Sequence, residues 1–192
     1  MADTRNRMLD AAIDALQRDG VAGMSFTSVL RDSGAARGAI YHHFPDGKGQ
    51  LVAEAAARNG EDVRAALAGL PTSRPLVLVR AFLDAVRPVL AASSAGGGCA
   101  IAAITVGQHD DDQLRSIAAH AFTSWTEVLA ERLEAAGLRR TDATDLATTL
   151  IMLLEGAHVL CRAAGTLEPF EQAARQAIAL TRSRYAAARP KQ

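Results

Sequence analysis

Hydrophobic residues recur along most of the chain at the three- and four-residue spacing of an amphipathic α-helix. Between residues 4 and 18, for example, Met8, Ala12 and Leu16 form one apolar stripe, and Gly20 ends the segment. Stretches with the alternating pattern of a β-strand are nearly absent. The pattern therefore predicts an all-α fold of about nine helices. These cover residues 4–18, 26–33, 36–44, 48–68, 76–93, 99–107, 112–137, 141–164 and 168–187.

The first three predicted helices have the layout of a helix-turn-helix unit. Ser25 is the expected N-cap of the second helix, Gly34 follows its last turn, and Pro45 limits the third. In such units the second of two short helices enters the major groove of DNA. A unit this small needs support, which the helix at 48–68 supplies as it links on to the rest. We therefore expect a DNA-binding domain at residues 1–50 and an effector-binding and dimerisation domain at 51–192.

The third predicted helix carries an unusual run of aromatic side chains. Aromatic residues make up 4% of the chain, yet Tyr41, His42, His43 and Phe44 are consecutive. Arg37 can bind guanine or phosphate, and the tyrosine hydroxyl and the imidazoles can donate to phosphate oxygens. Packing within the protein is the alternative use of such side chains. The helical period turns Arg37, Tyr41 and His42 outward, leaves His43 at the edge, and turns Ala36, Ile40 and Phe44 inward.

Small residues and a lysine flank this run. Gly38 and Ala39 lack bulk, so the helix backbone could approach the floor of a groove closely. Lys48, together with the free amides of residues 47–49, forms a potential anion site at the start of the next helix. Asp46 is unfavourable beside DNA, and we expect its carboxylate to cap those amides instead.

Composition and charge bound the function without deciding it. The 21 basic and 21 acidic residues give a formal net charge of zero, so a case for a nucleic-acid partner must rest on local placement. Asp10 and Asp14 interrupt the only apolar stretch near the N-terminus, which argues against a signal peptide. Glu155 and His158 interrupt residues 146–165, which argues against a membrane span. We expect a cytoplasmic protein.

Polar, aromatic and sulphur-containing side chains interrupt the apolar stripes of the larger domain, which suggests a ligand pocket. Such a lining suits a planar or hydrophobic effector. Taken alone, Trp125 is better explained as a core residue, and His158 is better explained by a hydrogen bond across a dimer interface than by a ligand. The candidates for the pocket are Cys99, Ile104, Phe122, Trp125, Met152, Glu155 and His158.

The helix at 141–164 is apolar nearly all the way round, so it must be covered on more than one side. One face can cover its own subunit, and another needs a partner. The last helix also has a broad apolar face. Burial of both helices within a monomer is the alternative. The candidates for a dimer interface are Leu154, Ala157, Cys161, Phe170, Ala174, Ala177 and Thr181.

Other classes of function are less well supported. No nucleophile lies at a diagnostic spacing from a base, and the glycines at 96–98 lack the lysine of a phosphate loop, so we expect no enzyme and no cofactor. His109 and the acids at 110–112 could suggest a metal, but adjacent acids on a loop more often cap the following helix, so we expect no metal site. Two alternative functions stay open. One is a redox sensor that uses Cys99 or Cys161, and the other is a helical binding module that does not contact DNA.

The segment "GAARGAIYHHFPDGKGQL", with "SFTSVLRDSG" before it, resembles the N-terminal domain of TetR/AcrR-type transcriptional regulators. The extra residue in "FPDGK" and the segment "GGGCAIAAITV" are similar to the LmrA/YxaF-like branch. Ala36 and Met24 depart from the usual proline and threonine. The residues that fit the pattern are Gly34, Gly38, Tyr41, His43, Phe44, Lys48 and Leu51.

This resemblance implies a dimeric repressor that binds a palindromic operator as double-stranded DNA and is released by a small effector. The family's four-helix dimer interface would be formed by the last two helices of each subunit. Arg5 and Arg7, on a flexible arm, would reach phosphates or a minor groove, or else form solvated surface. The implied DNA contacts are Thr27, Ser28, Arg37, Tyr41, His42, His43 and Lys48.

Overall fold

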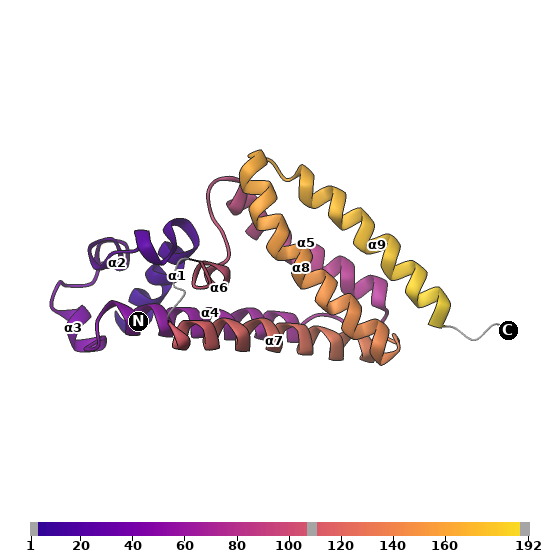
Figure 1. Ribbon diagram of the computed structural model, residues 1–192, viewed down its shortest axis with the longest axis horizontal. Helices are drawn as coiled ribbons and strands as arrows, with labels where there is room; N and C mark the ends of the chain where they lie inside the picture. Colours follow the sequence, from indigo (N-terminus) through magenta and orange to yellow (C-terminus); the bar gives the residue numbers. More distant parts are fainter. Residues whose placement is uncertain (1–3, 107–110, 189–192) are drawn as a thin grey trace. The chain divides into compact units, whose positions relative to one another are not determined.

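The computed structural model describes residues 4–106 and 111–188, which form nine α-helices (Figure 1). The all-α prediction is confirmed. His109 and Asp110, considered above as metal ligands, lie outside the described residues. The helices are α1 (Thr4–Gly23), α2 (Phe26–Ser33), α3 (Ala39–His43), α4 (Lys48–Ala68), α5 (Pro75–Ser94), α6 (Ala100–Ala103), α7 (Asp112–Ala135), α8 (Arg140–Ala164) and α9 (Glu168–Ala188).

These helices form two compact units. The N-terminal unit contains the described residues up to 62 and those from 99 to 121, and the C-terminal unit contains residues 63–98 and those from 122 onward. Helices α4 and α7 contribute to both. This division differs from the predicted boundary at residue 50, because α6 and the first part of α7 belong with α1 to α3. Where the functional domains divide stays a prediction.

Helix α1 forms the core of the N-terminal unit. Its stripe of Met8, Ala12 and Leu16 is buried, and the helix contacts both α2 and α6. Gly20, the predicted end of the helix, adopts a left-handed φ of 67° and breaks the regular geometry, after which the helix resumes to Gly23. A residue with a Cβ would be strained at that position.

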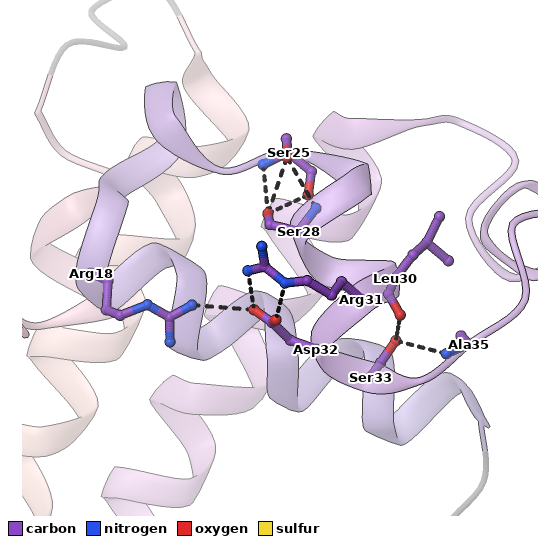
Figure 2. Close-up of polar contacts among 8 residues, drawn as sticks. All are labelled: Arg18, Ser25, Ser28, Leu30, Arg31, Asp32, Ser33 and Ala35. Atoms are coloured by element: carbon purple, nitrogen blue, oxygen red, sulfur yellow. Dashed lines mark hydrogen bonds and ion pairs between the residues drawn. The ribbon is translucent and has the colours of Figure 1, made fainter.

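Helix α2 is capped at both ends. Ser25 Oγ accepts a hydrogen bond from the Ser28 N–H at 3.1 Å, and Ser28 Oγ accepts one from the Ser25 N–H at 3.3 Å (Figure 2). Gly34, with a φ of 64°, ends the helix in the left-handed conformation. Both predicted caps are therefore confirmed, and this reciprocal arrangement is a capping box.

Helix α3 is shorter than predicted, with five residues. Residues 36–38 lie in the turn that precedes it, so Ala36 is exposed and does not face inward as expected. Phe44 leaves the helix with a φ of −133°, because the proline that follows it disfavours the helical conformation. The tertiary position of the helix depends on Ile40 and Phe44, which are fully buried.

In the C-terminal unit, α5, α8 and α9 pack against one another in pairs, as Figure 1 shows. Phe82 of α5, Leu150 of α8 and Phe170 of α9 are buried in this core. By length and apolar composition α8 could cross a membrane, but the core helix of a soluble protein meets the same criterion, and much of α8 is buried in this unit.

The length of α6 differs from the prediction, whereas the cap at the start of α7 agrees with it. Helix α6 covers four residues rather than the predicted 99–107, and Cys99 caps it by accepting a hydrogen bond from the Ala102 N–H at 3.4 Å. Asp111 Oδ1 accepts a hydrogen bond from the Leu114 N–H at 3.0 Å at the start of α7. This is the capping role considered above for the acids before that helix.

Candidate functional site

The exposed face of α3 holds the side chains that the sequence pointed to. Arg37, Tyr41 and His42 are exposed, His43 is half-buried, and Gly38 lies exposed at the N-terminal end of the helix. Tyr41 keeps 65% of its surface in contact with solvent. The structure therefore divides the helix into an apolar inner side and a polar, aromatic outer side. Ala39 is half-buried.

Ring contacts restrict the orientation of these side chains. The Tyr41 ring packs edge-to-face on Phe26 of α2, with centroids 5.9 Å apart. The rings of His42 and His43 pack in the same manner at 4.9 Å. Contacts of this geometry are favourable because the edge of one ring carries positive charge and the face of the other negative charge. The outer side of α3 is thus partly ordered without losing its exposure.

The loop between α3 and α4 is capped by a side chain that sequence reasoning missed. Gln50, in the first turn of α4, accepts a hydrogen bond from the Asp46 backbone N–H at 3.0 Å. The Asp46 carboxylate is exposed. Gln50 thus caps the Asp46 amide, and the Gly47 N–H donates to the Phe44 carbonyl at 3.0 Å rather than to the Asp46 carboxylate, so the capping role predicted for that carboxylate at Gly47 is corrected. The capping-box spacing places the side chain of a third helical residue near the preceding loop and was the available signal.

Gln50 belongs to a chain of contacts that reaches α1. Its Nε2 donates to Glu54 Oε1 at 3.0 Å, and Arg5 donates to the other oxygen of the same carboxylate. The Arg5 guanidinium also lies over the Phe44 ring, 5.4 Å from its centroid. Arg7 donates to the last carbonyl of α2 at 2.8 Å. Both arginines, expected on a flexible arm, instead brace the helix-turn-helix.

The two hydroxyls in the first turn of α2 differ in their surroundings: that of Thr27 lies on an exposed residue, and that of Ser28 forms hydrogen bonds within the chain. Thr27 is exposed. Ser28 Oγ takes part in the capping box and also donates to the Ser25 carbonyl at 2.8 Å. Lys48 is half-buried at the start of α4. Arg31 lies one helical turn after Thr27 and is exposed.

The pocket candidates do not share one environment. Trp125 is buried and packs edge-to-face on Phe122 with centroids 5.3 Å apart, which favours the core alternative for this tryptophan. Met152 is exposed, whereas both Glu155 carboxylate oxygens are buried. Cys99 and Ile104 belong to the N-terminal unit and the other five candidates to the C-terminal unit, so a common cavity stays a prediction.

His158 is buried and bonded within its own chain. Its Nδ1 lies 2.6 Å from Ser93 Oγ, which in turn donates to the Val89 carbonyl at 3.2 Å. The imidazole Nδ1–H is therefore the donor to the serine oxygen. Burial, followed by the positive charge of Arg162, lowers the pKa of His158 to about 4, so the ring is neutral near pH 7. The hydrogen bond expected across a dimer is found inside the chain.

The seven candidates for the dimer interface are all buried within the chain itself, among them Leu154 and Thr181. They pack where α8 and α9 meet each other and α5. The large apolar side chains that α8 exposes are different ones. These are Met152, Val159 and Leu160, at 70%, 68% and 58% of their full exposure. The seven predicted interface residues have little surface to offer a partner in this chain, so their role in a dimer stays a prediction.

Two families of known proteins match this sequence, and several relatives resemble most of its length. Residues 8–55 match the family described as "Bacterial regulatory proteins, tetR family", and residues 75–176 match "Transcriptional regulator LmrA/YxaF-like, C-terminal domain". An uncharacterised helix-turn-helix transcriptional regulator of Mycobacterium tuberculosis is 33% identical over 92% of this chain and 93% of its own length. The transcriptional regulator LmrA of Bacillus subtilis is 26% identical over 87% of this chain and 90% of its own length.

Solved structures agree on the fold. A TetR transcriptional regulator from Legionella pneumophila superposes with a TM-score of 0.80 at 22% identity, covering 92% of this chain and 96% of the other. One from Chloroflexus aurantiacus gives a TM-score of 0.70 at 26% identity, with 92% of each chain covered. With two family matches and a full-length relative, the chain belongs to the TetR family, whose members are DNA-binding transcriptional regulators and not enzymes, and its C-terminal part is of the LmrA/YxaF-like type.

Proposed function

We propose that the protein is a dimeric one-component repressor. Each N-terminal unit binds one half of a palindromic operator by placing α3 in the major groove, and a small molecule bound among the C-terminal helices releases the DNA. The observation that supports this most is the outer side of α3, where Arg37, Tyr41 and His42 are exposed on a helix fixed by buried Ile40 and Phe44. A regulator of this kind acts in the cytoplasm.

The exposed groups divide into those that set sequence preference and those that hold the phosphate backbone. Arg37 is the best candidate for a base contact because a guanidinium can bind the two acceptors of guanine together, and His42 is the second. Lys48 and Thr27, at the starts of α4 and α2, suit phosphate oxygens, which carry no sequence information. A five-residue α3 offers few other base contacts.

The proposal of a dimer is supported by the exposed row on α8. Met152, Gly156 and Val159 follow one another at spacings of four and three residues, with Leu160 beside them, so they share one face of the helix. Exposed apolar side chains in such a row are characteristic of a contact surface. Gly156 has no side chain, and a Cβ added there would have no atom of another part of the described chain within 4 Å, so a partner helix could approach closely at that point.

The proposed effector site lies among the C-terminal helices. The half-buried ring of Phe122 and the buried polar groups of Glu155 and His158 would suit a planar or hydrophobic molecule with a few polar atoms. A thermal-shift screen of such molecules, followed by DNA release with each one that raises the melting temperature, would identify it. Molecules that stabilise the protein without affecting DNA binding would contradict their role as effectors.

Binding to the gene's own upstream region tests the proposed function. Labelled DNA from that region and a scrambled duplex of equal length and composition are titrated with the protein, and fluorescence anisotropy reports the bound fraction. We expect tighter binding to the upstream region, with symmetric protection of two half-sites in a footprint. Equal affinity for the two duplexes would contradict operator recognition, and the absence of binding to either would favour a helical module without DNA contact.

A cysteine-based redox sensor is the second candidate function. The burial of the two cysteines favours Cys99 as the residue that would be oxidised. Cys161 is fully buried, whereas Cys99 is half-buried at the start of α6. If oxidation controlled release, Cys99→Ser would abolish the response to peroxide while Cys161→Ser would retain it. DNA release by a small molecule that survives in both variants would support the repressor with a bound effector.

A further inference from the structure

The exposed face of α2 carries a charged group beside a predicted phosphate contact. Val29 is fully buried, and Phe26 and Leu30 are half-buried, so this side of the helix faces the interior. Thr27 and Arg31 lie one turn apart on the opposite side. The Arg31 side chain is 74% exposed, which makes it a strong cation on the surface that continues from the first turn of α2.

The carboxylate of Asp32 pairs with two arginines, Arg31 and Arg18. Arg31 donates from Nε to Asp32 Oδ1 at 2.8 Å and from Nη2 to Oδ2 at 3.4 Å, and Arg18 of α1 donates from Nη2 to Oδ2 at 3.4 Å. Figure 2 shows both guanidinium groups approaching the same carboxylate. The hydrogen bond from Arg31 is the main reason that the pKa of Asp32 lies below its ordinary value. The cluster therefore holds one negative and two positive charges.

We propose that Arg31 is a further DNA-contacting residue, held on Asp32 in the free protein and transferred to a backbone phosphate in the complex. This inference rests on the proposed function. Carboxylate and phosphate accept the same forked pair of hydrogen bonds from a guanidinium, so either can serve as the partner. An ion pair this exposed is weak in water, and exchanging it for a phosphate costs little.

Arg18 has a separate part in this exchange. If Arg31 left Asp32 alone, an uncompensated carboxylate would remain close to the DNA and repel it. Arg18 comes from a different helix and can stay on Asp32, so the carboxylate remains neutralised. Arg18 is thus a positioning residue that acts through Asp32.

The salt dependence of DNA binding tests the role of Arg31. Affinities of the wild type, Arg31→Gln and Arg31→Lys for the scrambled duplex are measured over a range of potassium chloride concentrations. Loss of one phosphate contact lowers the slope of log K against log salt by about 0.9 per bound subunit, and we expect this for Arg31→Gln. Arg31→Lys keeps the charge and should keep the slope, with weaker binding. An unchanged slope in Arg31→Gln would overturn the proposal.

The role of Asp32 is tested with a charge-matched control. Asp32→Asn removes the competing acceptor and should tighten binding by about two- to fivefold at low salt, the range expected for an exposed ion pair. Asp19→Asn, on the exposed side of α1, makes the same change in net charge. Equal gains in both variants would show an effect of net charge alone and overturn the proposal.

A double-mutant cycle tests Arg18. Arg18→Gln should weaken binding when Asp32 is present and much less in the Asp32→Asn background, whereas equal losses in both backgrounds would contradict coupling through the carboxylate. Thermal unfolding checks that each variant folds, which we expect because the Arg31 contribution to the end of α2 is its backbone carbonyl. Wild-type protein that binds neither duplex would refute the proposed function and this inference together. Wild-type binding with an unchanged slope in Arg31→Gln would refute the inference alone.

Discussion

Helices α3 and α8 place their polar and apolar side chains in opposite environments. On α3, Tyr41 and His42 are exposed and the apolar Ile40 is buried. On α8, the imidazole of His158 is buried while Val159 beside it is exposed. A polar, aromatic surface suits a polyanion, whereas an apolar row suits another protein surface. On the proposed function, α3 therefore serves DNA and the exposed row of α8 serves a second copy of the chain.

The largest effect is expected from breaking the inner side of α3. Phe44→Ala removes a fully buried ring and should lower the free energy of unfolding by about 3–5 kcal/mol. Tyr41→Ala, three residues earlier, loses one ring contact and should cost less than about 1.5 kcal/mol while weakening DNA binding. Denaturant unfolding and anisotropy separate the two effects. Equal destabilisation by both variants would show that Tyr41 belongs to the core.

The buried polar group of α8 makes stability depend on pH. The folded-state pKa of His158 is about 4, below the ordinary value of 6.5, so the unfolded chain takes up this proton first as the pH falls. The stability is fully present above pH 6.5 and declines towards pH 4, by up to about 3 kcal/mol. Unfolding is measured across this range in the wild type and in His158→Gln, which lacks the proton site. Identical pH profiles would contradict burial of a neutral imidazole.

A smaller effect is expected from placing a charge on the exposed row of α8. Leu160→Glu should weaken self-association by about 2 kcal/mol or more if this residue lies in the subunit contact. Val77→Glu, on an exposed position of α5, is the matched control and should leave association unchanged. Sedimentation velocity over a range of concentrations reports the two species. A wild type that stays monomeric at micromolar concentration would contradict the dimer.

The features that the sequence predicted correctly are those that local geometry decides, namely helix caps and helix ends. Ser25, Gly34 and Pro45 act within a few residues of the chain, and the caps and the end of α3 follow from them. The inward position of Phe44 followed from the helical period. The extent of α3 was not predicted correctly, because the helical period alone does not distinguish the turn at residues 36–38 from the first turn of a helix.

Contacts between distant segments could not be predicted. Arg5 meets Glu54 only because α1 and α4 pack together, so its sequence position suggested a mobile arm. On α8 the apolar residues extend around the whole helix, and no periodic signal distinguishes Leu154, which is buried, from Leu160, which is exposed. The packing of α5 and α9 makes that choice. Met24, a departure from the family pattern, is buried as α2 begins, so its apolar side chain adds to the core.

A comparison of Arg37→Ala with Lys48→Ala tests most directly whether the outer side of α3 contacts the bases of DNA. The ratio of affinities for the upstream region and for the scrambled duplex is measured for each variant and for the wild type. We expect Arg37→Ala to lower this ratio by about tenfold, as loss of a base contact does, and Lys48→Ala to weaken both affinities with the ratio unchanged and a smaller salt slope. Equal losses of specificity in the two variants would contradict this division of roles.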